Sequence, residues 1–328
     1  MATRVGIGVY DENWFDHRLT LLETITVPSM AAQSDQGFTW LLVVDRNMPE
    51  RAAARLAGII AGLPNAVALP VEFKTDFGPT MAAWARDFAT RQDAEYVLTS
   101  RIDDDDALVT DGVERLHAEA EQYLTLGRPG RAVFSFTVGA MWIPTERRAY
   151  SRYHDSLGIG LSVLEPLAGG VRGVYDWPHL EIKQRLVPPG GYARGIDTAD
   201  PSWLYAAHPL SDSDDGDRKR LERVRGHRYG YRLDDAMLTR FGLDPVAVDT
   251  LARTEPPDVT TPVKRLATRA TKLEAEITRL RGELRHAEAR ADTEAVSALA
   301  GRIAELDERR RAAGQDLVAG GAGVTGRR

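Results

Sequence analysis

The first 110 residues alternate short apolar or β-branched runs with stretches of helical period, and this alternation constrains the fold more than any other feature. Strands separated by helices connect through crossovers, which produce a mainly parallel sheet with helices on both faces. Pro28 must kink or break the first helix, because proline lacks the amide N–H that a residue inside a helix donates. The predicted strands are 5–10, 38–45, 67–73 and 95–102, and the predicted helices between them are 18–33, 49–62 and 78–91.

The composition excludes several classes of protein. Lys and Arg number 42 against 48 Asp and Glu, and the resulting net charge of −6 disfavours binding to the phosphates of nucleic acid. The chain has no cysteine, which excludes disulfides and thiolate chemistry and fits a reducing compartment. It also has no apolar run of about 18 residues and enters its first strand directly. We therefore expect a cytoplasmic protein without a transmembrane segment.

Beyond residue 110 the pattern becomes less regular. A helix is predicted at 111–126 and a strand at 132–142, bent near Gly139. From about 145 to 230 the periodicity fades in a segment rich in Gly, Pro, Tyr and Trp, and long segments of this kind are usually functional or mobile. A place in the core is favoured for four aromatic side chains, although their faces could also contact a bound ligand: Trp142, Trp177, Tyr192 and Trp203.

The composition changes again at residue 262, where apolar residues begin to repeat at coiled-coil spacing. A first stripe comprises Leu266, Ala270, Leu273, Ile277, Leu280, Leu284, Ala287 and Ala291, and a second one comprises Val296, Leu299, Ile303 and Leu306. Asp292 or Thr293 can cap a helix between the stripes, which favours an antiparallel hairpin over one long helix. The hairpin forms a homodimer, docks the chain to a larger assembly, or folds back onto the rest of the chain.

These changes divide the chain into four predicted parts. A catalytic α/β domain spans residues 1–255, and a linker follows at 256–261. Coiled-coil helices occupy 262–314, and a disordered tail occupies 315–328.

Four consecutive aspartates, Asp103 to Asp106, follow the predicted strand at 95–102. Adjacent carboxylates repel one another, so a folded site that gathers them needs a cation or leaves them in water. In an extended or tightly turned segment Asp103 and Asp105 point to one side and Asp104 points away. Oxygen ligands suit Mn²⁺ or Mg²⁺, which commonly bridge to a diphosphate. The alternative is a solvated loop whose last aspartate caps the helix at 111.

The segments around this cluster carry a family resemblance. The stretch Pro28-Ser29-Met30 with Gln33, the stretch Gln36 to Leu41, and Thr99-Ser100-Arg101-Ile102 before the aspartates resemble the putative rhamnosyltransferase family. The resemblance covers about residues 4–245. It implies a GT-A-like fold, related to the Rossmann fold, and a nucleotide-sugar glycosyltransferase of the hexosyltransferase type.

The resemblance also implies roles for the residues that match the family motifs. Asp45 matches the acid that contacts the nucleotide base, and Tyr10 lies near the same pocket. Asp103 and Asp105 match the DxD motif, in which the first acid faces the ribose or sugar and the second acid binds the metal. Asp106 matches an acid that holds hydroxyl groups of the donor sugar.

Two further residues and a catalytic base complete the predicted site. Arg101 would lie beside the diphosphate or pair with the acidic cluster, and His208 would complete the metal site. The resemblance suggests an inverting reaction, in which a base removes the proton of the acceptor hydroxyl. The candidates for this base lie in the irregular segment, with Glu165 favoured by its position after the Gly139 strand: Asp155, Glu165, Asp176 and His179.

The sequence therefore predicts a metal-dependent glycosyltransferase. It would move a sugar, rhamnose by resemblance, from a nucleotide-sugar donor to a glycan, a lipid-linked acceptor or another hydroxyl group. The alternative from another class is a catalytically inactive scaffold protein with a GT-A-like domain that acts through its coiled coil. The sequence carries no P-loop, GxSxG or HExxH motif that would favour another enzyme class.

Overall fold

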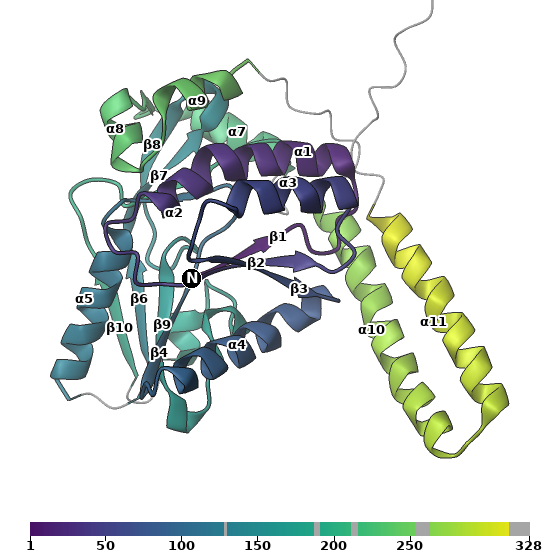
Figure 1. The fold of residues 1–328 in the computed structure, drawn as a ribbon. Coiled ribbons are helices and arrows are strands. Elements are labelled where there is room, and N and C mark those ends of the chain that lie inside the picture. Colours follow the sequence, from purple (N-terminus) through teal and green to yellow (C-terminus); the bar gives the residue numbers. More distant parts are fainter. Residues whose placement is uncertain (128–129, 187–190, 211–215, 254–262, 315–328) are drawn as a thin grey trace, which may run out of the picture.

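The computed structural model describes residues 1–127, 130–186, 191–210, 216–253 and 263–314, which form two sheets with flanking helices (Figure 1). Within these ranges the larger sheet has seven strands in the order β10-β6-β9-β4-β1-β2-β3. Its strands are β1 (Ala2–Val5), β2 (Trp40–Asp45), β3 (Ala66–Val71), β4 (Tyr96–Arg101), β6 (Ala132–Phe136), β9 (Leu161–Pro166) and β10 (Tyr192–Ile196). Neighbouring strands are parallel except at β9, which runs antiparallel to β4 and β6. The predicted α/β class with a mainly parallel sheet is confirmed.

A smaller sheet of five strands, in the order β12-β8-β7-β11-β5, lies beside the first in the described part of the chain. Its strands are β5 (Ala107–Leu108), β7 (Val138–Ile143), β8 (Arg148–Tyr153), β11 (Trp203–Ala206) and β12 (Tyr231–Arg232). The single strand predicted at 132–142 is instead two strands, β6 and β7, which belong to different sheets. Gly139 of β7 leaves room for the ring of Trp203 on the neighbouring β11, because a Cβ atom there would lie 1.9 Å from that ring.

Helices cover both faces of the larger sheet, with α1 and α3 on one face and α4 on the other (Figure 1). Leu42 of β2 belongs to the core that contains side chains of α1 and α3, while Leu41 and Val43 pack with Phe77 and Met81 of α4. A strand buried on both faces appears in sequence as a continuous apolar run, which is how β2 was recognised. The helices of this region are α1 (Glu12–Leu21), α2 (Val27–Ala31), α3 (Glu50–Ile60), α4 (Phe77–Arg91) and α5 (Gly112–Thr125).

The helices that follow in the described residues are shorter until the C-terminal pair. They are α6 (Ile182–Leu186), α7 (Gly216–Gly226), α8 (Asp235–Arg240) and α9 (Pro245–Leu251), and the C-terminal pair is α10 (Val263–Ala289) and α11 (Thr293–Ala313). None of the helices in the described ranges is both long enough and apolar enough to cross a membrane.

The first strand and the first helix begin earlier than the sequence indicates. Gly6 and Gly8 adopt left-handed backbone conformations, with φ of +57° and +82°, and they end β1 at Val5. Asp11 then caps α1 by accepting a hydrogen bond of 2.8 Å from the Trp14 amide. A wide π-helical turn, η1 (Leu22–Thr26), separates α1 from α2 and brings Pro28 into the first turn of α2, where its missing N–H is tolerated.

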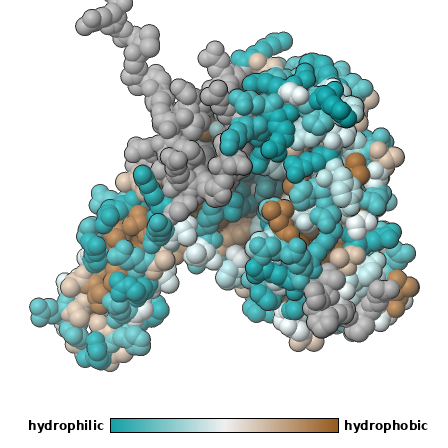
Figure 2. All heavy atoms as spheres, turned by 180° about the vertical axis from the view of Figure 1, so that it is seen from behind, coloured by the Kyte–Doolittle hydropathy of each residue, from teal (hydrophilic) through white to brown (hydrophobic). Residues whose placement is uncertain are grey.

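The C-terminal residues form the predicted antiparallel hairpin. Helices α10 and α11 pack side by side, and Asp292 caps α11 with a hydrogen bond of 3.1 Å from the Ala295 amide. Ile277, Leu280 and Leu306 bury their side chains with Phe73 of the main body, so the hairpin folds back onto it. Figure 2 shows the other end of the hairpin as an arm that extends away from the body, with hydrophobic side chains among hydrophilic ones.

Two of the predicted parts of the chain fall outside this description. The linker at 256–261 and the tail at 315–328 lie outside the described residues. The division into domains stays a prediction.

Candidate active site

The acidic cluster lies where the chain passes from the larger sheet to the smaller one. Asp103 to Asp106 follow the carboxyl end of β4 and precede β5. In open parallel sheets ligands bind beyond the carboxyl ends of the strands. A cavity of about 380 Å³ opens at this edge and is lined by all four aspartates. Asp106 donates its amide proton to the Asp103 carbonyl, at 3.4 Å, so the segment is a turn.

A buried arginine forms ion pairs with two of the aspartates. Arg18 of α1 is 4% exposed and pairs with Asp104, and its Nη1 lies 2.9 Å from Asp105 Oδ2. The same nitrogen lies 2.9 Å from Nε2 of His208, which follows β11. The expected arrangement, with Asp103 and Asp105 on one side, is therefore wrong: Asp104 and Asp105 both point to the buried Arg18, and Asp103 is left half-exposed at the cavity. The Arg18 guanidinium therefore supplies positive charge beside the aspartates, where the sequence analysis expects a divalent ion.

Asp105 and His208 are brought together as the sequence predicts. His208 Nε2 lies 2.7 Å from Asp105 Oδ2, and both side chains are buried. Burial alone would raise the pKa of Asp105, but the charge of Arg18 and the contact with His208 hold that pKa well below its usual range. The neighbouring His17 has a pKa lowered to about 3 by burial and by the positive charges of His208 and Arg18. Asp105 therefore stays ionised inside the protein.

Asp106 differs from Asp105 in its hydrogen bonds and in the direction in which its pKa is shifted. Its Oδ1 accepts a hydrogen bond of 2.9 Å from the Ala206 amide, whereas its Oδ2 is buried without a hydrogen-bond partner. Burial, together with the negative charges of Asp105 and Asp103, raises its pKa well above the usual value. An unpartnered carboxyl oxygen at the wall of a cavity is suited to hydrogen bonds with a ligand hydroxyl.

Arginines give the cavity an anion-binding character. Arg101 lies with its Nη2 3.7 Å from Asp103 Oδ1 and its guanidinium 4.5 Å from the centre of the Tyr175 ring. Its Nε is buried without a hydrogen-bond partner. Three other arginines besides Arg18 line the same cavity: Arg4, Arg152 and Arg220. Guanidinium groups are the side chains best suited to phosphate oxygens, and of these residues the sequence indicated only Arg101.

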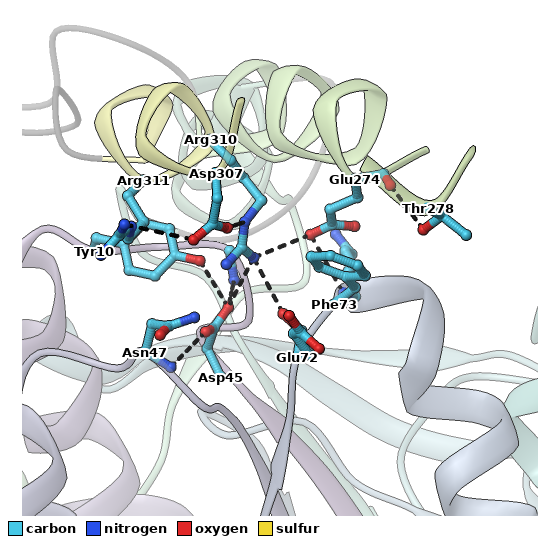
Figure 3. Close-up of polar contacts among 12 residues, drawn as sticks. Tyr10, Asp45, Asn47, Glu72, Phe73, Glu274, Thr278, Asp307, Arg310 and Arg311 are labelled. Atoms are coloured by element: carbon cyan, nitrogen blue, oxygen red, sulfur yellow. Dashed lines mark hydrogen bonds and ion pairs between the residues drawn. The ribbon is translucent and has the colours of Figure 1, made fainter. Parts of the chain in front are cut away.

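Asp45 lies at the carboxyl end of β2, at the same edge of the sheet (Figure 3). Its Oδ2 accepts hydrogen bonds of 3.0 Å from the Gly8 amide and from the Tyr10 hydroxyl, and its Oδ1 accepts one of 2.8 Å from the Asn47 amide. β2 and β4 flank β1, so the two strands that lead to Asp45 and to the acidic cluster lie about 10 Å apart in the sheet. Arg310 of α11 also lies against Asp45, with Nη1 3.7 Å from Oδ2.

Glu165 is not placed to act as the catalytic base. It is fully buried on β9 and accepts hydrogen bonds from Arg131, at 2.8 Å, and from the Gly173 amide, at 2.7 Å. Because β9 is antiparallel to β4, Glu165 pairs with Val97, four residues before the end of β4. It therefore lies about 13 Å along the strand from the end of β4, further still from the acidic cluster, and does not line the cavity. The sequence could not give the direction of β9, and the assignment fails for that reason.

The other candidates for the base differ in position. His179 lines the cavity, and burial together with the charge of Arg101 lowers its pKa to about 4. Asp176 pairs with Arg172, and Asp155 is exposed with Lys183 at 3.9 Å. A further imidazole, His154, lines the same cavity. Of the predicted candidates, His179 alone both faces the cavity and is neutral near pH 7.

The aromatic side chains belong to the core, as the favoured interpretation had it. Trp142 and Trp203 are fully buried and Trp177 is 6% exposed. Tyr192 packs against Tyr123 with ring centroids 5.1 Å apart. None of these four tryptophan and tyrosine side chains lines the cavity beside the acidic cluster.

The chain is similar to a known protein family in its sequence and to a solved structure in its fold. A family profile described as "Putative rhamnosyl transferase" matches residues 2–214, more than half of the chain. A crystal structure of an active-site mutant of LgtC is similar, with 13% sequence identity and a TM-score of 0.28, over 73% of this chain and 99% of that one. No curated protein sequence matches the chain.

Proposed function

The chain belongs to the putative rhamnosyl transferase family, and from this we propose that it moves a sugar from a nucleotide-sugar donor to a hydroxyl acceptor. Membership of the family supports a glycosyltransferase, and rhamnose is the first sugar to test. The observation that carries the proposal is the cavity itself, where arginines and four aspartates meet beyond the end of β4. Arginines suit the diphosphate of such a donor, and aspartates suit the hydroxyl groups of its sugar.

Each end of the donor has candidate partners. We place the diphosphate beside Arg101, Arg4 and Arg220, and the sugar beside Asp106, whose buried Oδ2 has no other partner. Asp103, half-exposed at the cavity, would accept hydrogen bonds from the ribose or the sugar. The nucleoside would extend along the sheet edge toward Asp45, which ends β2 as the acidic residue of dinucleotide-binding folds does.

The protein side chains at this site could bind Mn²⁺ or Mg²⁺ only together with the bound nucleotide sugar. In the described residues no group of three or more His, Asp or Glu side chains is arranged to hold a metal ion. Asp105 and His208 would provide two ligands, and diphosphate oxygens and water would have to complete the shell. When bound, the ion would neutralise charge on the leaving diphosphate. Arg18 already contacts both side chains and supplies part of that charge.

The remaining roles in an inverting reaction can be assigned to residues of this chain. The acceptor hydroxyl must lose its proton to a base at the cavity wall as the anomeric bond to the diphosphate breaks. We propose His179 for this role, because its ring is neutral at pH 7 and lines the cavity. Arg101 and Arg18 would remain fixed by their contacts with Tyr175, Asp104 and Asp105, and would stabilise the charge of the leaving group.

A screen of donors tests the proposed function. The protein is incubated with UDP-, dTDP- and GDP-activated sugars, rhamnose donors included, and the released nucleoside diphosphate is measured with Mn²⁺ or with EDTA. We expect one group of donors to be hydrolysed, with a rate at least about tenfold higher with Mn²⁺ because the ion supplements the charge of Arg18. Failure of every donor to bind or react would support the inactive scaffold instead.

His179→Ala is expected to lower kcat by a factor of about 10² to 10⁴, which is the usual contribution of a general base. KM for the donor should change little, since the proposed diphosphate ligands remain. His154→Ala provides the matched control, because this second imidazole lines the same cavity. Equal losses in both variants, or none in His179→Ala, would remove His179 from the mechanism. Steady-state kinetics on the donor found in the screen provides the measurement.

A further inference from the structure

The last turn of α11 inserts an arginine into the main body of the protein (Figure 3). The Arg310 side chain is fully buried, and its Nη1 donates a hydrogen bond of 3.1 Å to the carbonyl of Glu72. The same nitrogen lies 3.7 Å from both Asp45 Oδ2 and Glu274 Oε1. Asp307, one turn earlier on α11, accepts a hydrogen bond of 3.0 Å from its Nε. Arg310 thus joins both helices of the hairpin to the carboxyl ends of β2 and β3.

The place that Arg310 takes is suited to a nucleoside. Asp45 follows the second strand of a parallel sheet, the position from which an acidic residue holds the nucleoside in dinucleotide-binding folds. Tyr10 adds a flat aromatic face beside this carboxylate, with its hydroxyl on Asp45 Oδ2. The cavity that holds the acidic cluster continues along the sheet edge to Gly6, and neither Asp45 nor Tyr10 lines it.

Arg310 makes with these two residues the contacts that a nucleobase would make. A nucleobase offers N–H donors to a carboxylate and a flat face to an aromatic ring. The guanidinium is likewise planar, carries N–H groups beside Asp45, and lies 5.6 Å from the centre of the Tyr10 ring. The Tyr10 amide also donates a hydrogen bond of 3.1 Å to the carbonyl of Gly314, which directly follows α11.

No room remains for a base while the hairpin is in place. A Cβ atom at Gly314 would lie 2.6 Å from the Tyr10 ring and 2.7 Å from the Gly8 carbonyl, so even a methyl group does not fit there. Asp45 itself is 1% exposed. A nucleobase and the last turn of α11 therefore exclude each other at Asp45 and Tyr10.

The contact is built so that it can be released. Nη2 of Arg310 and Oε2 of Glu274 are both buried without a hydrogen-bond partner, which makes the buried charges incompletely satisfied. Incompletely bonded buried ion pairs contribute little net stability, because desolvation offsets their attraction. Phe73 is the one residue of the main body in the buried apolar cluster of the described interface, where it packs with Ile277, Leu280 and Leu306 of the hairpin. Docking can thus be close in free energy to undocking.

We infer that the C-terminal hairpin is an autoinhibitory element whose Arg310 occupies the nucleoside end of the donor site, so that the hairpin must undock before the donor binds. The inference rests on the proposed function, because it assumes a nucleotide donor. The apparent affinity for the donor would then be lowered by the fraction of molecules in which the hairpin is docked. Anything that holds the arm away from the body would activate the enzyme.

Variants of the full chain test this directly. Isothermal titration calorimetry with UDP, dTDP and GDP is carried out on the wild type and on Arg310→Ala. We expect the variant to bind one of these nucleotides at least about tenfold more tightly. This is the change in Kd expected if the hairpin is docked in about nine-tenths of the wild-type molecules and undocked in the variant. Arg309→Ala is the matched control, since this neighbouring side chain is 57% exposed and points to Glu305, and it should bind like the wild type.

A second variant loosens the hairpin without touching Asp45. Arg281 of α10 pairs with Glu72 and lies over the Phe73 ring, so Arg281→Ala should also raise the affinity, by about threefold. Weaker or unchanged binding in both Arg310→Ala and Arg281→Ala would overturn the inference and leave the proposed function standing, because it would mean that the hairpin completes the nucleoside site or does not affect it.

Hydrogen exchange separates this failure from a failure of the proposed function. The end of α11 should lose protection in Arg310→Ala, and in the wild type when the nucleotide is saturating. Greater protection of α11 with nucleotide would contradict the inference. Undocking in Arg310→Ala with no nucleotide bound by any variant would instead refute the nucleotide donor, and with it both proposals.

Discussion

Asp105→Asn is expected to lower kcat for donor transfer by about a thousandfold. The side chain holds its charge between Arg18 and His208, and the substitution removes the carboxylate that fixes both groups at the cavity. Loss of a preorganised charge next to a reacting diphosphate typically costs a factor of about 10² to 10³ in rate, and the loss of a proposed metal ligand adds to it. The rate is measured with the donor identified in the screen, in the presence of Mn²⁺.

Asp104→Asn is the matched control for this experiment. Asp104 pairs with the same buried arginine, whereas Asp105 pairs with it and also contacts His208. We expect kcat of Asp104→Asn to remain within about tenfold of the wild type. The substitution weakens the pairing with Arg18 but leaves the contact between Asp105 and His208 in place. If Asp105→Asn turns over donor at the wild-type rate, the acidic cluster has no catalytic role and the proposed mechanism fails.

Glu165→Ala is expected to lower the free energy of unfolding by about 3–5 kcal/mol while leaving the chemistry of the folded enzyme intact. The substitution removes a fully buried carboxylate, which leaves the amides of Arg172 and Gly173 without this acceptor and the partly exposed Arg131 without its charge partner. Removing one partner of a buried pair costs about this much, because the remaining polar groups stay desolvated. Urea denaturation provides the measurement.

The control for Glu165 is an ion pair on the surface. Glu181 and Arg185 are both exposed and lie one helical turn apart, so Glu181→Ala should change the free energy of unfolding by less than about 0.5 kcal/mol. A large loss of kcat in folded Glu165→Ala, with little change in stability, would return Glu165 to the catalytic candidates.

Local patterns in the sequence predict where the helices and strands of this fold occur. They predict less well which of these elements lie side by side. The apolar run of β2 and the heptads of α10 are recognised because each is buried over its whole length or along one stripe. The run at 132–142 gives no sign that the chain changes sheet at Thr137, because residues of both β6 and β7 are buried. The direction of β9 is equally invisible, and it decides the fate of Glu165.

The candidate site shows the same limit. The position of Asp103 to Asp106 at the end of β4 could be predicted, because a polar cluster after a buried strand is a local signal. Their partner Arg18 is 87 residues away from Asp105. A signal for it does exist, since Arg18 lies on the face of α1 that also carries the buried Trp14, and a charge on an apolar helix face requires a buried partner. Arg310 carries a comparable signal on α11, next to the buried Leu306.

The ionic cluster of Arg18 is also a joint between two halves of the molecule. Asp104 and Asp105 follow β4 of the seven-stranded sheet, and His208 follows β11 of the five-stranded sheet, and one guanidinium holds both. Any slippage between the sheets must therefore pull apart the charges that the chemistry needs.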